Sequence, residues 1–273
     1  VAGGMQRVAI LGANGRMGVA LVRLIAASDR AVLAGALTEP GHASVGRDAG
    51  LQAGLDALGV RLTDQLDVAL ADCDVAIDFT APAATARHAQ ACAARGCSLV
   101  VGTTGLGDAE LAALKSAAGR IALLYSRNMS IGITVLTELV RQAARLLGPD
   151  FDAEITEAHH RAKKDAPSGT ALQLGEAVAE ARAQKFAEVA VYDRSGMSAG
   201  RPAQAIGFAS VRAGSIVGDH TVLLASDEEV LELTHRATDR ALFARGALRA
   251  ANWLKGQPAG FYSMQDVLGL SGR

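Results

Sequence analysis

The sequence has little cysteine, few aromatic residues and almost no net charge, and each shortage excludes a class of protein. Three of the 273 residues are cysteines, and no two of them form a CxxC pair, which disfavours a disulfide scaffold and a zinc knuckle. Aromatic residues make up 4 %, so the core must consist mainly of alanine, valine, leucine and isoleucine. The 27 basic and 28 acidic residues nearly cancel, which argues against a protein that mainly coats nucleic acid or an anionic membrane.

Long apolar runs are also lacking. We find none that approaches the ~18–20 residues of a membrane helix, and residues 1–7 lack the basic region and apolar segment of a signal peptide. We therefore expect a soluble, cytoplasmic protein. In that setting Cys73, Cys92 and Cys97 stay reduced and serve as small buried hydrophobic residues. With 50 % hydrophobic and 20 % charged residues, the chain can form a sizeable core.

Short apolar segments alternate with alanine-rich helical patterns in the first half of the chain. The apolar segments predict strands at 7–11, 32–37, 75–79, 98–101 and 121–125. Helical spacing of apolar residues predicts helices over 15–27, 83–95 and 108–118. This alternation predicts a parallel, doubly wound sheet. Ligands bind such sheets at the carboxyl ends of the strands, where this sequence places glycine and polar turns.

The pattern changes near residue 130. Residues 131–147 predict a long helix that ends at Gly148-Pro149. Strand-like segments follow at 153–158, 205–213, 220–225 and 230–235, with short spacings that allow hairpins. We expect an exposed loop over 193–202 and a helix over 239–255. The fold class is therefore α/β, with a doubly wound sheet over 1–130 plus 239–273 and a second α+β domain with an open mixed sheet over 131–238.

The segment GANGRMG (12–18) follows a strand and begins a helix, as a dinucleotide-binding turn does. Glycine lets the backbone approach a pyrophosphate, and the helix N-terminus supplies N–H groups. The spacing is GxxGxxG rather than GxGxxG, so a tight turn without a ligand is the alternative. Glu39 follows the second strand, where an acidic residue binds ribose hydroxyls, although a surface glutamate is the alternative. No arginine adjoins Glu39, which favours NADH, whereas Arg16 leaves NADPH open.

The segment GTTG (102–105) ends another predicted strand of the same sheet. Its N–H groups and hydroxyls are suited to the ribose and nicotinamide side of a dinucleotide. A plain turn between strand and helix is equally compatible with four such residues. Its position on the same sheet edge as the turn at Gly12 favours the binding interpretation.

A dense cluster of chemically active residues lies between Glu157 and Thr170. His159 and His160 follow a predicted strand, three cations come next, and Ser168 is a good N-cap for a helix that begins after it. A helix N-terminus beside cations binds carboxylate or phosphate, and histidine and lysine can transfer a proton near neutral pH. A solvated basic loop is the alternative.

Other kinds of site are poorly supported. Adjacent histidines on a strand face opposite sides, and no HExxH or Cys/His set accompanies them, so we expect no metal site. No cysteine lies near a motif, which disfavours a cysteine nucleophile. The cations of one loop do not form the basic, aromatic surface that binds nucleic acid.

Five segments taken together resemble one enzyme family. They are GANGRMG (12–18), DFT (78–80), VVGTTG (100–105), EAHHRAKKDAPSGTA (157–171) and GFASVRAGSIVGDHTV (207–222). In this order, over nearly the whole chain, they resemble the 4-hydroxy-tetrahydrodipicolinate reductases, also called dihydrodipicolinate reductases, of diaminopimelate and lysine biosynthesis. The resemblance implies a Rossmann-like dinucleotide-binding domain, a second domain that binds a dicarboxylate, and a homotetramer formed through the second domain's sheet.

The resemblance also implies residue roles. His159 falls on the family's acid/base histidine and Lys163 on its proton-donating lysine, with the substrate carboxylates held at the helix start Ser168–Thr170. Substrate contacts fall on His160, Gly169 and Thr170. Contacts to NADH or NADPH fall on Gly12, Ala13, Asn14, Gly15, Arg16 and Met17, on Gly102, Thr103 and Thr104, and on Ser126, Arg127, Asn128 and Met129. Many members carry an acid followed by arginine where this chain has Thr38-Glu39, so the choice between NADH and NADPH stays open.

Two other functions remain as alternatives. One is a regulator that senses NAD(P) without catalysing a reaction. The other is a related amino-acid dehydrogenase, such as an aspartate-type enzyme, which we would not expect to carry the segment HHRAKKDAPSGT (159–170).

Overall fold

The computed structural model describes residues 4–196 and 200–270, and the chain divides into two compact units. Unit 1 comprises residues 1–129 and 241–273, and unit 2 comprises residues 130–240. The sequence pattern placed the corresponding boundaries after residues 130 and 238. Of the loop expected over 193–202, residues 197–199 lie outside the described part of the chain.

Unit 1 is built on a seven-stranded sheet with the order β12-β6-β5-β4-β1-β2-β3. Its strands are β1 (Gln6–Leu11), β2 (Ala31–Leu37), β3 (Leu62–Thr63), β4 (Val75–Asp78), β5 (Ser98–Val101), β6 (Ala122–Tyr125) and β12 (Gly260–Tyr262). Every neighbouring pair is parallel. The run β3-β2-β1-β4-β5-β6 is the strand order of dinucleotide-binding α/β folds, in which the chain reverses direction across the sheet between β1 and β4. The predicted doubly wound parallel sheet is therefore confirmed.

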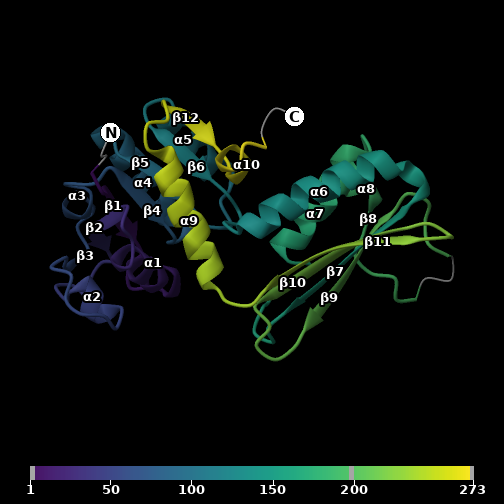
Figure 1. The fold of residues 1–273 in the computed structure, drawn as a ribbon, viewed down its shortest axis with the longest axis horizontal. Coiled ribbons are helices and arrows are strands. Elements are labelled where there is room, and N and C mark those ends of the chain that lie inside the picture. The colour runs from purple at the N-terminus through teal and green to yellow at the C-terminus, as the bar shows by residue number, and fades with distance from the viewer. Residues whose placement is uncertain (1–3, 197–199, 271–273) are drawn as a thin grey trace. The chain divides into compact units, whose positions relative to one another are not determined.

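Helices cover this sheet on both faces (Figure 1). They are α1 (Arg16–Ala26), α2 (Ala49–Gln52), α3 (Leu66–Ala69), α4 (Pro82–Arg95), α5 (Asp108–Ala118), α9 (Ala241–Leu254) and α10 (Met264–Val267). Helix α9 packs against α1 and strands β4 to β6. A Cβ on Gly246 would lie 1.7 Å from the carbonyl oxygen of Met129, so α9 can approach residue 129 this closely only with glycine there.

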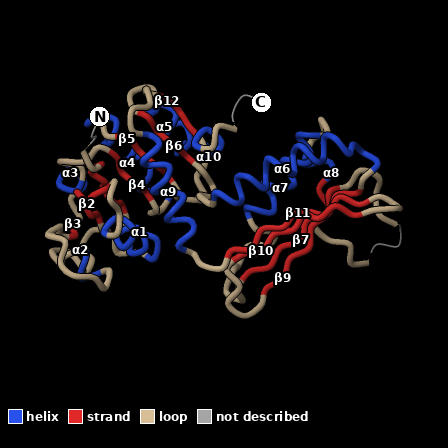
Figure 2. Tube along the Cα trace, in the orientation of Figure 1, coloured by secondary structure: helices blue, strands red, loops and turns tan. Residues whose placement is uncertain are grey.

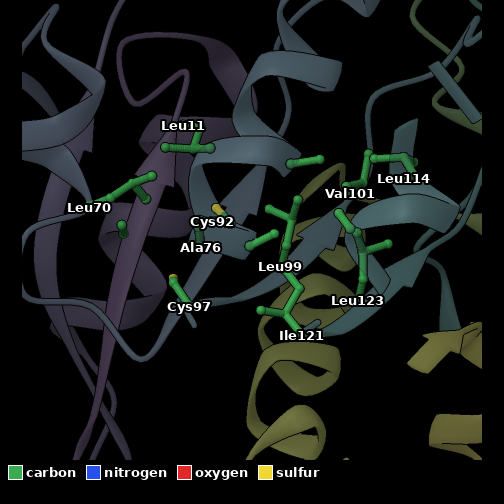
Figure 3. Close-up of a cluster of buried hydrophobic side chains, with 14 of the residues drawn as sticks. Leu11, Leu70, Ala76, Cys92, Cys97, Leu99, Val101, Leu114, Ile121 and Leu123 are labelled. Atoms are coloured by element: carbon green, nitrogen blue, oxygen red, sulfur yellow. The ribbon is translucent and has the colours of Figure 1, made fainter. Parts of the chain in front are cut away.

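The layer between the sheet and helices α4 and α5 forms a hydrophobic core (Figure 3). Alternate residues of the strands, such as Leu11, Leu99 and Leu123, pack with Cys92 of α4 and Leu114 of α5. Each of these leucines is fully buried, which contributes about 1.5–3 kcal/mol per side chain. This core fixes the strands whose carboxyl ends carry the predicted turns.

The cysteines belong to this core. Cys92 and Cys97 are buried and free, as predicted, whereas Cys73 is only partly buried. The Sγ atoms of Cys73 and Cys97 lie 2.8 Å apart. The contact with Cys97 and burial raise the pKa of Cys73. The contact with Cys73 acts to lower the pKa of Cys97, but Cys92 and burial raise it overall. Both thiols therefore stay protonated and unreactive at neutral pH.

Unit 2 contains a five-stranded mixed sheet with the order β11-β10-β7-β9-β8. Its strands are β7 (Asp152–His159), β8 (Ala190–Val191), β9 (Ile206–Arg212), β10 (Gly218–Ala225) and β11 (Val230–Ala237). Strand β9 is parallel to β7 and β8, while β10 is antiparallel to β7 and β11. The predicted mixed sheet is confirmed.

The expectation of successive hairpins is correct for β10 and β11 but wrong for β9 and β10. Strand β7 lies between β9 and β10, although only five residues, 213–217, connect them. This short connection passes the end of β7, where Ala213 N donates to His159 O (2.9 Å) and Arg161 N donates to Gly214 O (3.2 Å). The crossing brings β9 and the start of β10 to either side of His159.

One face of this sheet is covered by the helices α6 (Ile131–Leu147) and α7 (Gly169–Ala181) (Figure 2). A 3-10 turn (Gly148–Asp150) follows α6, and a short helix α8 (Phe186–Val189) follows α7. Ile155, Val222 and Leu224 are fully buried in the core beneath the helices. Residues on the opposite face remain exposed, including Val211 (51 %) and Val230 (57 %).

Candidate functional site

In unit 1, the turn after β1 is shaped by glycine. Gly12 has a φ of +85°, and the N–H groups of Gly12 and Ala13 both donate to Leu37 O (3.0 and 2.8 Å). A Cβ on Gly18 would lie 2.2 Å from Gly12 O, so α1 can begin this close to the turn only with glycine at that position. Gly15 is the N-cap of α1 and has no side chain with which to cap it. The first N–H groups of α1 are therefore oriented to bind an anion, which fits a pyrophosphate.

The other predicted residues of this turn lie at its surface. Arg16 is exposed in the first turn of α1, whereas Met17 and Asn14 are half-buried. After β2, the Glu39 side chain is 69 % exposed, and its carboxylate lies 3.7 Å from His42 Nε2. That exposure leaves the carboxylate accessible to ribose hydroxyls.

The turns after β5 and β6 lie on the same sheet edge. Thr103 is buried and Thr104 is exposed, and a Cβ on Gly102 would lie 2.2 Å from the ring of Phe79. After β6, Ser126 Oγ donates to Asn128 O (2.7 Å), which fixes the turn that carries Arg127 and the buried Met129. The carboxyl ends of β1, β5 and β6 thus bring the predicted cofactor residues to one edge of a single parallel sheet.

In unit 2, a buried carboxylate organises the predicted catalytic segment. Glu157 is 3 % exposed and points to the helix-covered face of β7. Its Oε2 accepts from His159 Nδ1 (2.5 Å) and Arg212 Nη1 (2.9 Å), and its Oε1 accepts from Arg212 Nη2 (2.7 Å) and Ser168 N (3.2 Å). One carboxylate therefore joins β7, β9 and the start of α7.

The protonation states follow from this arrangement. Burial acts to raise the pKa of Glu157, but the bonds from Arg212, Ser210 and His159 lower it to about 2. Burial, together with the nearby Lys163 and Arg212, lowers the pKa of His159 overall although Glu157 acts to raise it, so the imidazole is neutral at neutral pH. Because Nδ1–H donates to Glu157, the lone pair of neutral His159 is on Nε2.

A second buried histidine lies next to His159. The rings of His159 and His220 meet edge to face with centroids 5.1 Å apart, and His220 Nε2 lies 3.1 Å from Ser168 Oγ. Burial and the neighbouring His159 lower the pKa of His220 to about 4. A Cβ on Gly218 would lie 3.0 Å from His159 Nε2, so a small residue at 218 keeps this nitrogen uncrowded.

The predicted anion site begins at Ser168, which is the N-cap of α7 as the sequence predicted. Its Oγ accepts from Ala171 N (3.2 Å). Gly169 is exposed, and a Cβ there would meet no described atom within 4 Å. The first residue of the helix, Gly169, therefore lies beside open space, which fits a carboxylate ligand.

The predicted proton donor Lys163 is mostly buried, and its Nζ donates to Asp165 Oδ2 (2.9 Å). Burial acts to raise the pKa of Asp165, but Lys163 and other donors lower it overall, so this carboxyl is ionised at neutral pH. His160 lies just after β7 and is half-buried. His159 thus ends β7 and Thr170 lies in the first turn of α7, with His160 and Lys163 in the connection between them.

Sequence reasoning assigned no role to Glu157, Arg212 or His220, which complete this cluster. Glu157 lies two residues before His159 on a strand and so shares its face, a signal that could have identified it. Arg212 and His220 reach the cluster only through the pairing of β9 and β10 with β7, which the sequence does not reveal.

The described residues also bear on two other kinds of site. None of the helices in this part of the chain is long and apolar enough to cross a membrane. The described side chains also contain no group of three or more His, Cys, Asp or Glu residues that could hold a metal ion.

Together, the strand order, the glycine turn and the second mixed-sheet unit define a Rossmann-type, dinucleotide-dependent oxidoreductase. The chain belongs to the dihydrodipicolinate reductase family: the family's N-terminal model matches residues 6–129, and its C-terminal model matches residues 132–268. This family is NAD(P)H-dependent.

Individual relatives agree with this assignment. The 4-hydroxy-tetrahydrodipicolinate reductase of Anaeromyxobacter dehalogenans is 50 % identical over 98 % of this chain and 99 % of its own. The enzyme of the same name from Alkalilimnicola ehrlichii is 52 % identical over 97 % of this chain and 99 % of its own. Among solved structures, the dipicolinate-bound dihydrodipicolinate reductase of Paenisporosarcina sp. TG-14 is 25 % identical, with a TM-score of 0.76 over 96 % of this chain and 99 % of that one.

Proposed function

We propose that this chain reduces 4-hydroxy-tetrahydrodipicolinate to tetrahydrodipicolinate with NADH or NADPH and loss of water, in diaminopimelate and lysine biosynthesis. The observation that carries the proposal is the cluster around His159 in a chain that belongs to the dihydrodipicolinate reductase family. A histidine anchored by a buried carboxylate, a lysine and an open helix start are what a reaction on a dicarboxylate imine requires.

Unit 1 is the dinucleotide-binding domain in this proposal. When bound, the nicotinamide cofactor supplies the hydride. The uncapped start of α1 and the turn from Gly12 to Met17 would hold the pyrophosphate, and Glu39 would bind the ribose hydroxyls. The turns Gly102–Thr104 and Ser126–Met129 would line the nicotinamide side. Glu39 is exposed beside His42 rather than beside an arginine, which supports NADH, while the exposed Arg16 keeps NADPH in the proposal.

Unit 2 binds the substrate in this proposal. The helix start at Ser168–Thr170 and His160 hold the two carboxylates, because N–H groups and a histidine ring suit anionic oxygens. Lys163, whose Nζ also donates to Asp165, donates the proton that completes reduction. Neutral His159 presents a lone pair at Nε2, which suits it to accept a carbon-bound proton of the substrate and return it to the hydroxyl group, so that this group leaves as water.

The second domain also serves assembly in this proposal. The face of its sheet opposite α6 and α7 exposes Val211 and Val230, and burying apolar residues of this kind stabilises a subunit interface. We propose a homotetramer formed through this face, located in the cytoplasm and with no nucleic-acid partner. Light scattering at micromolar protein should give about four times the chain mass of 28.0 kDa, and a monomer mass would contradict the assembly.

The activity is tested by the absorbance of the reduced cofactor at 340 nm. Protein is mixed with the freshly made condensation product of pyruvate and aspartate semialdehyde, together with NADH or NADPH. A decrease that requires both protein and substrate is expected, and the two rates determine the cofactor preference. Binding of NADH without turnover would instead favour a regulator or another substrate.

A further inference from the structure

A second buried carboxylate lies in unit 1, at the end of β4. Asp78 is fully buried, and three donors converge on its Oδ1: Thr80 N (3.0 Å), Thr80 Oγ1 (2.6 Å) and Thr103 Oγ1 (3.2 Å). Its Oδ2 lies 2.9 Å from Nδ1 of His88, which is also buried, on α4. Asp78 belongs to the DFT segment (78–80), to which neither the sequence motifs nor the proposed mechanism assigns a role.

The bonds of Asp78 join the turns that follow two neighbouring strands. Thr80 lies in the turn after β4 and Thr103 in the turn after β5, and Thr80 N also donates to Thr103 Oγ1 (3.1 Å). Thr103 is one of the residues expected to contact the cofactor. Asp78 thus fixes the spacing of these two turns at the edge of the sheet.

The same segment also contacts the glycine turn after β1. A Cβ on Gly12 would lie 3.0 Å from Phe79 O and 3.1 Å from Thr80 Cγ2, and a Cβ on Gly102 would overlap the Phe79 ring. Residues 78–80 therefore lie against both glycine positions. A shift of Thr80 would disturb the turns after β1, β4 and β5 together.

A structural role alone does not explain a carboxylate here. Burying a charged group is costly unless hydrogen bonds compensate it, and an apolar residue would fill the same space at lower cost. The carboxylate of Asp78 orients its donors, because one oxygen accepts hydrogen bonds from the hydroxyl groups of Thr80 and Thr103 and from Thr80 N. His88 orients the carboxylate from behind, as a histidine and carboxylate orient each other in other sites.

We propose that Asp78, oriented by His88, is a positioning residue for the nicotinamide cofactor. It holds the turns at Thr80 and Thr103 in their binding arrangement before the dinucleotide arrives. The proposal rests on the assignment of the dinucleotide to this edge of unit 1. It predicts that loss of the carboxylate weakens binding of NADH more than it slows turnover at saturating NADH.

The first test is Asp78→Asn, which keeps the size of the side chain but removes its charge. Charge-assisted hydrogen bonds are roughly twice as strong as neutral ones, so the Kd for NADH should rise about tenfold. It is measured by fluorescence of bound NADH, and kcat at saturating NADH should stay within about twofold. Gln6→Leu is the control, since Gln6 is also buried and bonds Ala251 O at the opposite end of β1. It should leave the Kd unchanged.

A double-mutant cycle with Thr80 tests whether Asp78 acts by positioning Thr80 or by contacting the cofactor itself. The Thr80 variants also provide a test if Asp78→Asn does not fold. Thr80→Val removes the hydroxyl group that donates a hydrogen bond to Asp78, and Thr80→Ser retains that group. Thr80→Val should weaken NADH binding, and Thr80→Ser should restore it. Because Thr80 N and Thr103 Oγ1 still donate to Asp78 in Thr80→Val, adding Asp78→Asn should weaken binding further, but by less than Asp78→Asn does in the wild type.

Three outcomes would overturn the proposal. One is an unchanged Kd for NADH in folded Asp78→Asn or, if that variant does not fold, in Thr80→Val. Another is full additivity of the effects of Asp78→Asn and Thr80→Val on the free energy of NADH binding. If the wild type itself binds neither NADH nor NADPH, the proposed function fails first, and the role of Asp78 fails with it.

Discussion

Replacement of Glu157 by glutamine tests the cluster in unit 2 most sharply. The substitution keeps the shape of the side chain but removes the charge that Arg212 and His159 share. One end of the new amide becomes a donor, which must then face Arg212, Ser168 N or His159 Nδ1, all of which are donors in this arrangement. At least one of these bonds is lost whichever way the amide is oriented.

The size of the effect on stability follows from the pKa of Glu157. The carboxyl titrates near 2 rather than at its ordinary value of 4.5, and each unit corresponds to about 1.4 kcal/mol. The folded state therefore favours the ionised form by roughly 3 kcal/mol. Breaking one side of a buried ion pair costs a similar amount, about 3–5 kcal/mol. We expect Glu157→Gln to lower the free energy of unfolding by about 3 kcal/mol at pH 7.

Activity should fall as well, because Glu157 orients His159 and raises its pKa. Without the carboxylate the imidazole is no longer held with its lone pair on Nε2, and we expect kcat to fall about 100-fold. The stability is measured by urea unfolding and the activity by oxidation of NADH at 340 nm.

Glu154→Gln is the matched control for this substitution. Glu154 lies on the same strand, on the opposite face, and pairs with Arg194 and Arg201 near the surface. Its loss should cost less than about 1 kcal/mol and leave kcat unchanged. If Glu157→Gln behaved like Glu154→Gln in both measurements, the reasoning about the buried carboxylate would be refuted.

Three further predictions concern other parts of the molecule. Lys163→Ala should lower kcat about 100-fold or more and leave the Kd for NADH unchanged. Unchanged turnover would exclude Lys163 as the proton donor. The folded state holds the pKa of His220 near 4, below its ordinary 6.5, so the unfolded state binds more protons and stability is lost as pH falls through this range. Urea unfolding should show that the free energy of unfolding decreases by about 2 kcal/mol from pH 7 to 5, and the decrease should be smaller in His220→Asn. Gly18→Ala places a Cβ 2.2 Å from Gly12 O and should weaken NADH binding at least about tenfold, as a fluorescence titration would show.

The fold of unit 1 could be predicted largely because its elements are marked locally. Apolar runs such as 98–101 and helical patterns such as 108–118 coincide with β5 and α5. Strands β3 (Leu62–Thr63) and β12 (Gly260–Tyr262) were not predicted. They are too short to show a period, and pairing with β2 and β6 makes them strands.

The candidate site was predictable only in part. The cap at Ser168 follows from the type of residue before the helix, and the structure confirms it. The connection of Glu157 with Arg212 depends on the register of β7 and β9, which are separated by 46 residues, and local patterns carry no information on that register. Likewise, Asp78 and Thr103 meet because β4 and β5 are neighbours. Which residues contact cofactor and substrate stays a prediction.

Transfer of a labelled hydride is the measurement that tests the proposed reaction most directly. The protein is incubated with the condensation product of pyruvate and aspartate semialdehyde and with NADH deuterated at the transferable position, and the product is analysed by mass spectrometry. We predict tetrahydrodipicolinate one mass unit heavier than with unlabelled NADH, formed in equal amount to the NADH oxidised and without the substrate's hydroxyl group. Oxidation of NADH without label in this product, or a labelled product that retains the hydroxyl group, would contradict the account.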